Sequence, residues 1–546
     1  MKKIIGAAIG SCVHVAGLHH FLEIAESEGY ESISFGPAVS VSRLLEIIRD
    51  EKPDIVAVSY RLTPESAARL FQELKSGLER EGITGYRMIF GGTPPVAAVA
   101  DRYGLFERLF DGTGPPGAVR EYLRGGTSGV SLAKHADTLL ERISQKYPYP
   151  VIRHHFGRPT VEETLDGVEM IAEAGVLDVI SLGPDQNAQE HFFHPDEMDH
   201  TQDGAGGVPV RTEADLEAIY NRSRCGNYPL VRCYAGTRDL IRWAEMSVRT
   251  IKNAWGAIPL CWYSIIDGRS QRTIEEAVRE NQSVMKWYAD RDLPVEVNES
   301  HQWSLREAHD SLAVAMAFLA AWNARRAGVK RYVSQYMFNN PPGTSPEMDI
   351  AKMLAKNEMI ERLTGDNFSV IRQVRAGLAH FSPEPDFAKG QLAASAVISL
   401  ALKPHIVHVV GYSEGDHAVL PEELIESCRI VHGTIHDIMK GMPDLTAGET
   451  VQERKKELIS EAGMILKALH DAGAGRSEDP WSDPALIAEA VRSGLFDTPH
   501  FTANEYLSGK IATRLINGAW YAVDPLSGEK MTEEQRINKI PGPWQA

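Results

Sequence analysis

The stretch Ile4-Ile5-Gly6-Ala7-Ala8-Ile9-Gly10-Ser11-Cys12-Val13-His14-Val15-Ala16-Gly17 decides how the first part of the chain folds. Its apolar half is typical of a buried strand, and apolar residues recur after it at helical spacing, at Leu18, Phe21, Leu22 and Ala25. His14 and Gly17 are therefore expected in a loop between a strand and a helix. Parallel sheets bind ligands at the carboxyl ends of their strands, where a neutral imidazole can coordinate a metal. Taken alone, His14 is better explained as an ordinary surface histidine.

Composition limits the classes of protein that this chain can belong to. Its 546 residues are enough for two or more domains, and its net charge of −17 argues against nucleic acid or an anionic membrane as a partner. The five cysteines contain no CxxC pair, which excludes a zinc pattern and a disulfide framework. We find no signal peptide and no apolar run of about 18 residues, so we expect a cytoplasmic protein.

Strand and helix signals alternate over residues 1–125, which we predict to form one domain. Strands are expected near residues 4–9, 31–36, 54–59, 87–90 and 109–113, with helices between them and a last helix from Pro116. This alternation predicts an α/β fold with a flavodoxin-like, doubly wound parallel sheet.

Unusual residues follow four of these strands, at what becomes one edge of the sheet. They are His14 and Gly17 after the first strand, Ser59 after the third, Gly91 and Gly92 after the fourth, and Gly112 and Thr113 after the fifth. Paired glycines let a ligand approach the backbone closely, although glycines after strands also form ordinary turns. The convergence of four loops is what favours a binding site.

This pattern resembles the cobalamin-binding domain of base-off/His-on B12 enzymes, above all the small subunit of adenosylcobalamin-dependent glutamate mutase (methylaspartate mutase). That family has Asp-x-His-x-x-Gly, then Ser-x-Leu, then Gly-Gly. The matching segments here are Cys12-Val13-His14-Val15-Ala16-Gly17 after Ser11, Ser59-Tyr60-Arg61-Leu62 (one residue longer), Gly91-Gly92 and Gly112-Thr113-Gly114-Pro115-Pro116. The resemblance implies that His14 is the lower axial ligand of cobalt. It implies that the cofactor's nucleotide tail binds between the sheet and its helices, past Ser59 and the glycine pair.

One departure from this family concerns the partner of the histidine. The family has an aspartate that accepts a hydrogen bond from the ligating ring, and such partners fix the ring and raise its basicity. Here Cys12 stands in that position, and Ser11 is the alternative partner. Both are weaker acceptors than a carboxylate, so the resemblance predicts a differently tuned cobalt–histidine bond.

Beyond a linker and helix at residues 126–147, strand and helix signals alternate again over residues 148–440. A first strand is expected to end at His154-His155, and further strands near 176–181, 229–233, 258–262, 294–297, 331–335 and 405–410. The repeat predicts a TIM (β/α)8-type barrel with its active site at the carboxyl ends of the strands. The polar candidates there are His154, His155, Arg232, Tyr263, Glu299, His301, Gln335 and Tyr336. Residues 441–546 are expected to form a helical and small β extension.

The barrel region resembles the large subunit of glutamate mutase. Val231-Arg232-Cys233-Tyr234-Ala235-Gly236-Thr237-Arg238-Asp239 is similar to the segment that carries a substrate-carboxylate arginine, which maps to Arg232. Arginine suits this role because its fork binds a carboxylate bidentately. Shorter similarities occur at 272–276, 490–497, 513–519 and 522–524. The family's other two arginines map near His154-His155 and Gln189, and its catalytic glutamate has no counterpart, which implies a substrate other than glutamate. Glu414 or Asp416 is the implied partner of the adenosyl ribose.

The resemblance therefore predicts an adenosylcobalamin-dependent radical mutase, a carbon-skeleton isomerase acting on a small carboxylate-bearing substrate. Homolysis of the Co–C bond would yield an adenosyl radical that abstracts hydrogen from the substrate. The predicted catalytic residues are Arg232, His154, His155, Tyr263 and His301. A homodimer and a reactivating chaperone are further expectations from this resemblance.

Two other functions stay open. A corrinoid-dependent methyltransferase uses the same cobalamin fold, usually behind a helical cap, whereas this domain begins at residue 1. A non-catalytic corrinoid-binding protein would not require the large barrel. The cluster His191, His194, Asp196, Asp199 and His200 is more simply a solvated loop than a metal site.

Overall fold

The computed structural model describes residues 2–114, 117–125, 135–234, 236–504 and 507–544. The chain divides into two compact units, Met1–Lys134 and His135–Ala546. The predicted linker residues 126–134, together with Pro115, Pro116 and Ala235, lie outside the described residues.

The first unit is the predicted flavodoxin-like sheet. Its five parallel strands are β1 (Lys3–Ala8), β2 (Glu31–Ser34), β3 (Ile55–Tyr60), β4 (Arg87–Gly92) and β5 (Arg108–Phe110), in the order β2-β1-β3-β4-β5. Its helices are α1 (Ala16–Ser27), α2 (Val41–Glu51), α3 (Pro64–Glu81), α4 (Pro94–Arg102) and α5 (Ala118–Gly125). Alternate strand residues pack against α1 and α5 on one face and against α2, α3 and α4 on the other, as the period of two in strands requires.

The second unit contains the predicted barrel, which is nearly closed. Its eight parallel strands are β6 (Val151–Phe156), β7 (Val179–Leu182), β8 (Leu230–Cys233), β9 (Gly256–Ile258), β10 (Val295–Val297), β11 (Arg331–Phe338), β12 (Ser369–Ala376) and β13 (Ile406–His408). Ladders run in the order β8-β7-β6-β13-β12-β11-β10-β9, and β8 and β9 share no ladder within the described residues. Sequence analysis missed β12. It also carried β9 too far, because the Leu260 and Cys261 amides donate to Glu299 Oε2 (2.9 and 3.0 Å) instead of extending the strand.

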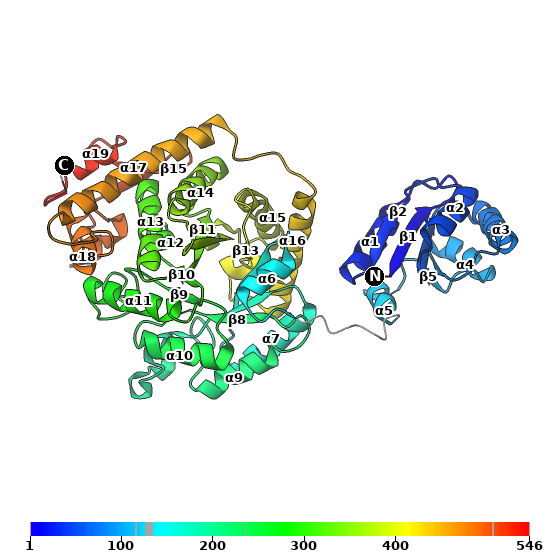
Figure 1. Ribbon diagram of the computed structural model, residues 1–546, viewed down its shortest axis with the longest axis horizontal. Helices are drawn as coiled ribbons and strands as arrows, with labels where there is room; N and C mark the ends of the chain where they lie inside the picture. The colour runs from blue at the N-terminus through cyan, green and yellow to red at the C-terminus, as the bar shows by residue number, and fades with distance from the viewer. Residues whose placement is uncertain (1, 115–116, 126–134, 235, 505–506, 545–546) are drawn as a thin grey trace. The chain divides into compact units, whose positions relative to one another are not determined.

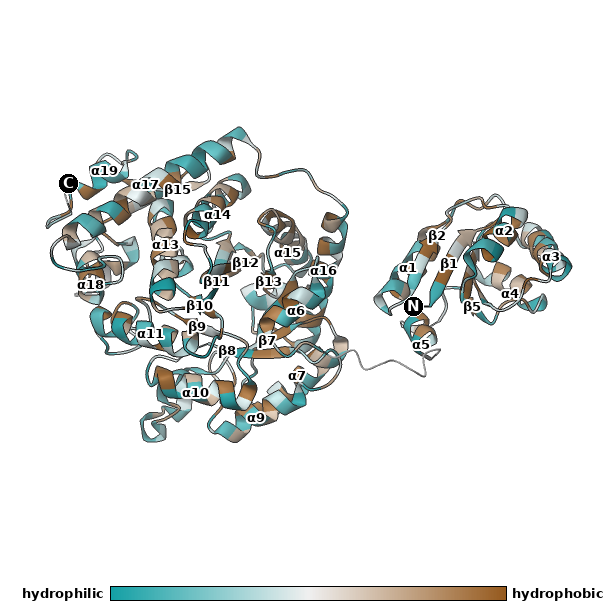
Figure 2. Ribbon diagram, in the orientation of Figure 1, coloured by the Kyte–Doolittle hydropathy of each residue, from teal (hydrophilic) through white to brown (hydrophobic). Residues whose placement is uncertain are grey.

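Helices surround this barrel. They are α6 (Leu139–Lys146), α7 (Val161–Ala174), α8 (Gln186–His191), α9 (Glu213–Arg222), α10 (Leu240–Ile251), α11 (Ile274–Ala289), α12 (Ser300–Ser304), α13 (Asp310–Arg326), α14 (Pro346–Glu361), α15 (Pro385–Leu400) and α16 (Pro421–Met439). Figure 2 shows hydrophobic and hydrophilic residues alternating along α9, α10 and α11, as expected for helices with one buried face. No helix in the described ranges is long and apolar enough to cross a membrane.

The C-terminal extension consists of α17 (Glu449–Gly473), α18 (Pro484–Ser493), the hairpin β14 (Ala512–Ile516) and β15 (Ala519–Val523), and α19 (Glu533–Ile537). The long helix α17 packs against α13 and α14 (Figure 1). A buried ion cluster joins these helices: Asp310 contacts Lys352 Nζ at 3.1 Å and Arg454 Nη2 at 3.1 Å. The extension is therefore an integral part of the second unit.

Two layers of side chains fill the barrel interior and place its polar centre. An apolar layer at the amino-terminal end is covered by Leu139 and Ile143 of α6 and consists of Val151, Val179, Leu230, Trp255, Val333, Ile371 and Ile406. Two residues further along six of these strands, the same inner face carries only polar side chains: Arg153, Ser181, Arg232, Gln335, Gln373 and His408. The barrel is thus sealed at one end and polar toward the carboxyl ends of its strands.

Candidate functional site

A cavity of about 350 Å³ lies at the carboxyl edge of the first sheet. Gly17, Ser59, Gly91, Gly92 and Gly112 all line it, as the convergence of loops predicts. A second cavity of about 570 Å³ adjoins it around Gly112 and is lined by Thr113. The loops after β1, β3, β4 and β5 therefore form one continuous recess.

The two glycines at the end of β4 serve different purposes. Gly91 pairs with Ser59 and Phe110 on the neighbouring strands, and a Cβ on Gly91 would meet only the Phe110 carbonyl oxygen, at 4.0 Å. A side chain at Gly91 would thus occupy space in the cavity. A Cβ on Gly92 would lie 2.6 Å from the Tyr60 oxygen, so this glycine is required by packing.

His14 lies in the exposed loop between β1 and α1. Its Nδ1 is 3.8 Å from the Sγ of Cys12, which is fully buried. The Cys12 backbone is fixed on both sides, because its N–H donates to Ile9 and its carbonyl accepts from Ala38. Sequence analysis left Cys12 and Ser11 open as partners, and the structure gives Cys12 as the neighbour of Nδ1. The other ring nitrogen, Nε2, makes no hydrogen bond to any residue that the structure describes.

The segment after β3 fits the recess only in part. Ser59 and Arg61 line the cavity, whereas the predicted Leu62 is 39% exposed and is not among the lining residues. The additional residue in this segment, relative to Ser-x-Leu, therefore brings Arg61 rather than Leu62 to the recess.

In the barrel, a single carboxylate connects the polar layer. Glu296 of β10 is 1% exposed, and its Oε2 accepts from Arg232 Nη2 at 3.1 Å, Arg153 Nη1 at 3.4 Å and Trp255 Nε1 at 2.7 Å. Its Oε1 accepts from Gln373 Nε2 at 3.0 Å. Although burial favours the neutral acid, Arg232 and Arg153 hold the pKa of Glu296 below its ordinary value. The carboxylate is thus fully engaged by the protein.

Two histidines are oriented by this layer. Arg153 Nη2 donates to His155 Nε2 at 2.8 Å, which assigns the ring proton to Nδ1. Gln335 Nε2 donates to His301 Nδ1 at 3.1 Å, which assigns that proton to Nε2. Burial lowers the pKa of His301 to about 3 and, with the nearby arginines, holds the pKa of His155 well below its usual value. Both rings are therefore neutral, with one N–H each available as a donor.

The remaining predicted barrel residues divide between the mouth and the outer face. His154 faces away from the interior, with its buried Nε2 3.8 Å from Glu414 Oε2. Glu414 lies in the short helix η4 (Tyr412–Gly415), and the exposed Asp416 pairs with His417 at 2.9 Å. Tyr263 has a positive φ of 60°, and the guanidinium carbon of Arg269 lies 4.6 Å from the centroid of the Tyr263 ring.

Two other polar candidates serve the packing. Tyr336 is buried outside the polar layer and donates to Asn357 at 2.9 Å. Glu299 accepts from the Leu260 and Cys261 amides and from Trp303 Nε1 at 2.8 Å.

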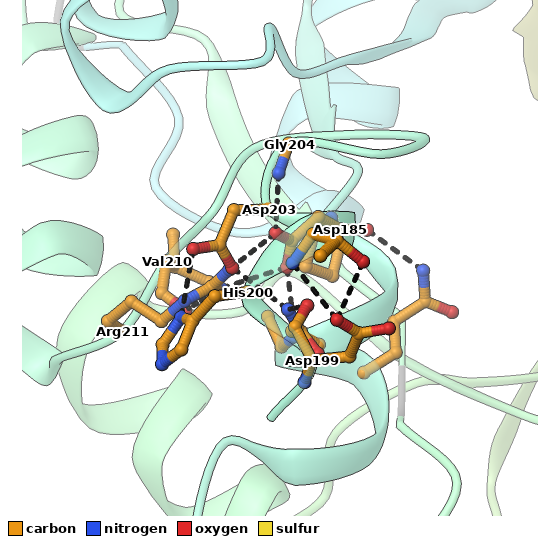
Figure 3. A network of polar contacts seen from close by, with 12 residues as sticks. Asp185, Asp199, His200, Asp203, Gly204, Val210 and Arg211 are labelled. Atoms are coloured by element: carbon orange, nitrogen blue, oxygen red, sulfur yellow. Dashed lines mark hydrogen bonds and ion pairs between the residues drawn. The ribbon is translucent and has the colours of Figure 1, made fainter. Parts of the chain in front are cut away.

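The loop after β7 is held together by its own charges (Figure 3). Asp185 is fully buried and accepts from both Nη atoms of Arg211, at 2.9 and 2.6 Å, and from the Gly204 amide at 2.9 Å. Hydrogen bonds from Arg211, His200 and Asn187 lower the pKa of Asp203 to about 2. Within the described residues, no group of three or more metal-ligating side chains could hold a metal ion. Hydrogen bonds thus connect Asp185, Asp203 and His200 with Arg211, Asn187 and the Gly204 amide.

Sequence analysis missed several members of the polar layer. The residues concerned are Arg153, Glu296, Gln373, Arg375 and His408. The available signal was the recurrence of charged side chains at every second position of otherwise apolar strands, as in Arg153 and His155 of β6.

Comparison with known proteins supports the assignment of the first unit. Residues 2–113 match the B12 binding domain family. Residues 2–113 are a B12-binding domain. No curated protein matches the chain. A cobalamin-binding protein from Desulfitobacterium hafniense DCB-2 is 27% identical over 22% of this chain, with a TM-score of 0.20, and the chain spans 58% of that protein's length.

Two further solved structures show similarity to the chain. A truncated 3-deoxy-D-arabino-heptulosonate 7-phosphate synthase from Thermotoga maritima is 12% identical, covering 54% of this chain and 88% of that one, with a TM-score of 0.32. The cobalamin-dependent S-adenosylmethionine radical enzyme OxsB is 9% identical, covering 89% of this chain and 70% of that one, with a TM-score of 0.20.

The B12-binding domain has the features that its cofactor needs. The recess beside Gly91 has room that a side chain would fill, and the exposed His14 lies in the loop between β1 and α1, outside the lining residues of both cavities. A neutral imidazole nitrogen is a suitable cobalt ligand. The recess and the exposed imidazole therefore fit the cobalamin that a B12-binding domain binds.

Proposed function

We propose that this chain is an adenosylcobalamin-dependent radical mutase that isomerises a small carboxylate-bearing substrate other than glutamate. The observation that carries the proposal is the polar layer of the barrel, where Arg153, Arg232 and Arg375 gather around Glu296 in a chain that also has a B12-binding domain. When bound, adenosylcobalamin supplies a carbon-centred radical by homolysis of its cobalt–carbon bond.

Arg232 is the residue best suited to hold the substrate carboxylate. Its Nη2 is engaged by Glu296, whereas its buried Nε and Nη1 have no hydrogen-bond partner in the described part of the chain. Buried donors without partners are costly, so a carboxylate that accepts from them gains both charge and hydrogen bonds. The Trp255 ring, 5.2 Å from the Arg232 guanidinium carbon, keeps the fork in place.

His155 and His301 complement this arginine. Each presents one N–H from a neutral ring whose other nitrogen is already occupied. A neutral N–H donor can bind a substrate oxygen without transferring a proton to it. This suits hydrogen abstraction, because that step needs no general base. The polar layer thus binds and orients the substrate, while the apolar layer below it excludes water.

The test is incubation of the full chain with adenosylcobalamin and small carboxylic acids, without oxygen. Isomerisation at unchanged mass, followed by nuclear magnetic resonance, together with a substrate-dependent electron paramagnetic resonance signal, is the expected result. Arg232→Gln should abolish both, whereas Arg279→Gln on the exposed face of α11 should not. Methyl transfer from methylcobalamin to an acceptor would instead identify a methyltransferase. Cobalamin binding without either reaction would identify a corrinoid-binding protein.

A further inference from the structure

We infer that the polar layer of the barrel takes a carboxylate that carries no ammonium group, and therefore discriminates against amino acids. This inference rests on the proposed function and narrows its substrate class. Three observations support it: the hydrogen-bonding atoms of the layer that are already occupied, those that have no partner, and the net charge of the layer.

The carboxylate and side-chain amide oxygens of the layer are occupied. Both oxygens of Glu296 accept from Arg153, Arg232, Trp255 and Gln373. The side-chain oxygen of Gln373 accepts from Arg153 Nη1 at 3.0 Å, and that of Gln335 accepts from Gln373 Nε2 at 3.0 Å. An ammonium group needs such acceptors, because it carries three donors and no lone pair.

Most free groups of the layer are donors; the exceptions are Ser181 Oγ and His408 Nδ1, which are buried without a partner in the described part of the chain and are neutral groups that can also accept. Arg232 Nε and Nη1 and Arg153 Nε are buried without partners, and His155 Nδ1 and His301 Nε2 make no hydrogen bond to any described residue. Arg375 adds a guanidinium whose only hydrogen bond within the described ranges is from Nε to the Ala376 carbonyl, at 3.4 Å. A carboxylate, which accepts only, matches this set.

The charge of the layer favours the same class of ligand. The guanidiniums of Arg153, Arg232 and Arg375 are opposed by two carboxylates, Glu296 and Glu414. With neutral histidines, these five groups carry a net charge of one positive unit. After burial, the arginines are the main causes that lower the pKa of His155 and His408. The same positive potential opposes an ammonium group placed beside these rings.

The neighbouring carboxylates cannot supply a free anionic acceptor for an ammonium group. Glu299 accepts two backbone amides and Trp303, and Asp267 accepts the Tyr263 and Ser264 amides at 3.3 and 3.2 Å. Glu414 accepts from the Gly411 amide at 3.1 Å and is the carboxylate that faces Arg375. Each is already engaged by backbone or by a cation.

Matched pairs of acids test the inference, since each pair differs only in the ammonium group. The full chain is titrated by calorimetry with succinate and aspartate, glutarate and glutamate, and 2-methylsuccinate and 3-methylaspartate. We expect the ammonium-free member of at least one pair to bind at least tenfold more tightly. Arg232→Gln should remove that binding, and Arg279→Gln should retain it. Gln335→Glu, which adds an anionic acceptor beside His301, should reduce or reverse the preference for the ammonium-free acid.

The outcomes separate this inference from the proposed function. Equal or tighter binding of the amino acids overturns the inference, and their isomerisation would still support a mutase. Selective binding of the ammonium-free acid supports the inference, and an absence of isomerisation would then overturn the mutase alone. If no acid of any pair binds, the inference is overturned. If, in addition, no small carboxylic acid is isomerised, the proposed mutase function is overturned as well.

Discussion

We expect Glu296→Gln to lower the free energy of unfolding of the second unit by about 3–5 kcal/mol. The change removes one charge and one acceptor while preserving the shape of the side chain. Arg153 and Arg232, each 1% exposed, would then lose their shared counter-ion inside the barrel. An uncompensated buried charge is among the few causes of so large a loss from a single substitution.

The hydrogen bonds explain why the amide cannot replace the carboxylate. Glu296 accepts from four donors, and a glutamine would turn an NH2 group toward at least one of them. Gln373 cannot rotate its own amide to compensate, because its oxygen is bound by Arg153. The substitution therefore creates a donor–donor contact in any orientation, in addition to the loss of charge.

Tryptophan fluorescence in urea measures this effect on one unit alone. All nine tryptophans of the chain lie beyond residue 240, so the signal reports the second unit. Glu275→Gln, the same chemical change in an exposed pair on α11, is the control and should cost less than about 0.5 kcal/mol. Adding Arg153→Met to Glu296→Gln should recover part of the loss. A loss below about 1 kcal/mol for Glu296→Gln would refute the buried charge arrangement.

Three other substitutions test separate features. Gly91→Leu should weaken cobalamin binding at least about tenfold, because overpacking a preformed site costs on the order of 1–3 kcal/mol. Equilibrium dialysis measures this affinity, and an unchanged value would show that the nucleotide tail does not bind in the recess. Cys12→Asp should raise cobalamin affinity about 10-fold and increase the histidine-ligated absorption spectrum, since a carboxylate is a stronger partner for Nδ1. Glu533→Gln should flatten the loss of stability in acid. Burial opposes ionisation of Glu533, but Arg536 and His309 lower its pKa from 4.5 to about 2. Its carboxylate therefore contributes about 3 kcal/mol above pH 4.5, and this is lost as the pH falls toward 2. If the urea midpoint of the variant falls between pH 5 and 3 as steeply as that of the wild type, this assignment is wrong.

Sequence patterns were sufficient for the first unit because its information is local. The central strands β1, β3 and β4 are short and mostly apolar, and Ser59, Gly91 and Gly92 lie at the carboxyl ends of β3 and β4. Once the strands are parallel, their carboxyl ends must share an edge, so Gly17, Ser59 and Gly91 were predicted to converge without knowing any contact. The exceptions are His14, which lines neither cavity, and Leu62, where one extra residue after Ser59 changed which side chain lines the cavity.

The barrel was harder to predict because polar residues interrupt its strands. β12 reads Ser369-Val-Ile-Arg-Gln-Val-Arg-Ala376, in which Gln373 and Arg375 occupy the inner face and hide the strand from an apolar pattern. The structure shows why these side chains are tolerated: Gln373 donates to Glu296 and Gln335, and the charge of Arg375 is opposed by Glu414 and Glu296. A strand that lines a polar barrel centre therefore lacks the signal by which buried strands are recognised.

The partners of this layer could not be derived from sequence, because only closure of the barrel brings them together. Glu296 lies 64 residues from Arg232 and 143 from Arg153, and Arg153 lies 220 from Gln373. Seen in sequence, Arg232 is either a substrate clamp or half of a core ion pair. In the structure Nη2 pairs with Glu296, and Nε and Nη1 have no hydrogen-bond partner among the described residues. The ion pair orients the guanidinium, and the unused donors are what a carboxylate can bind.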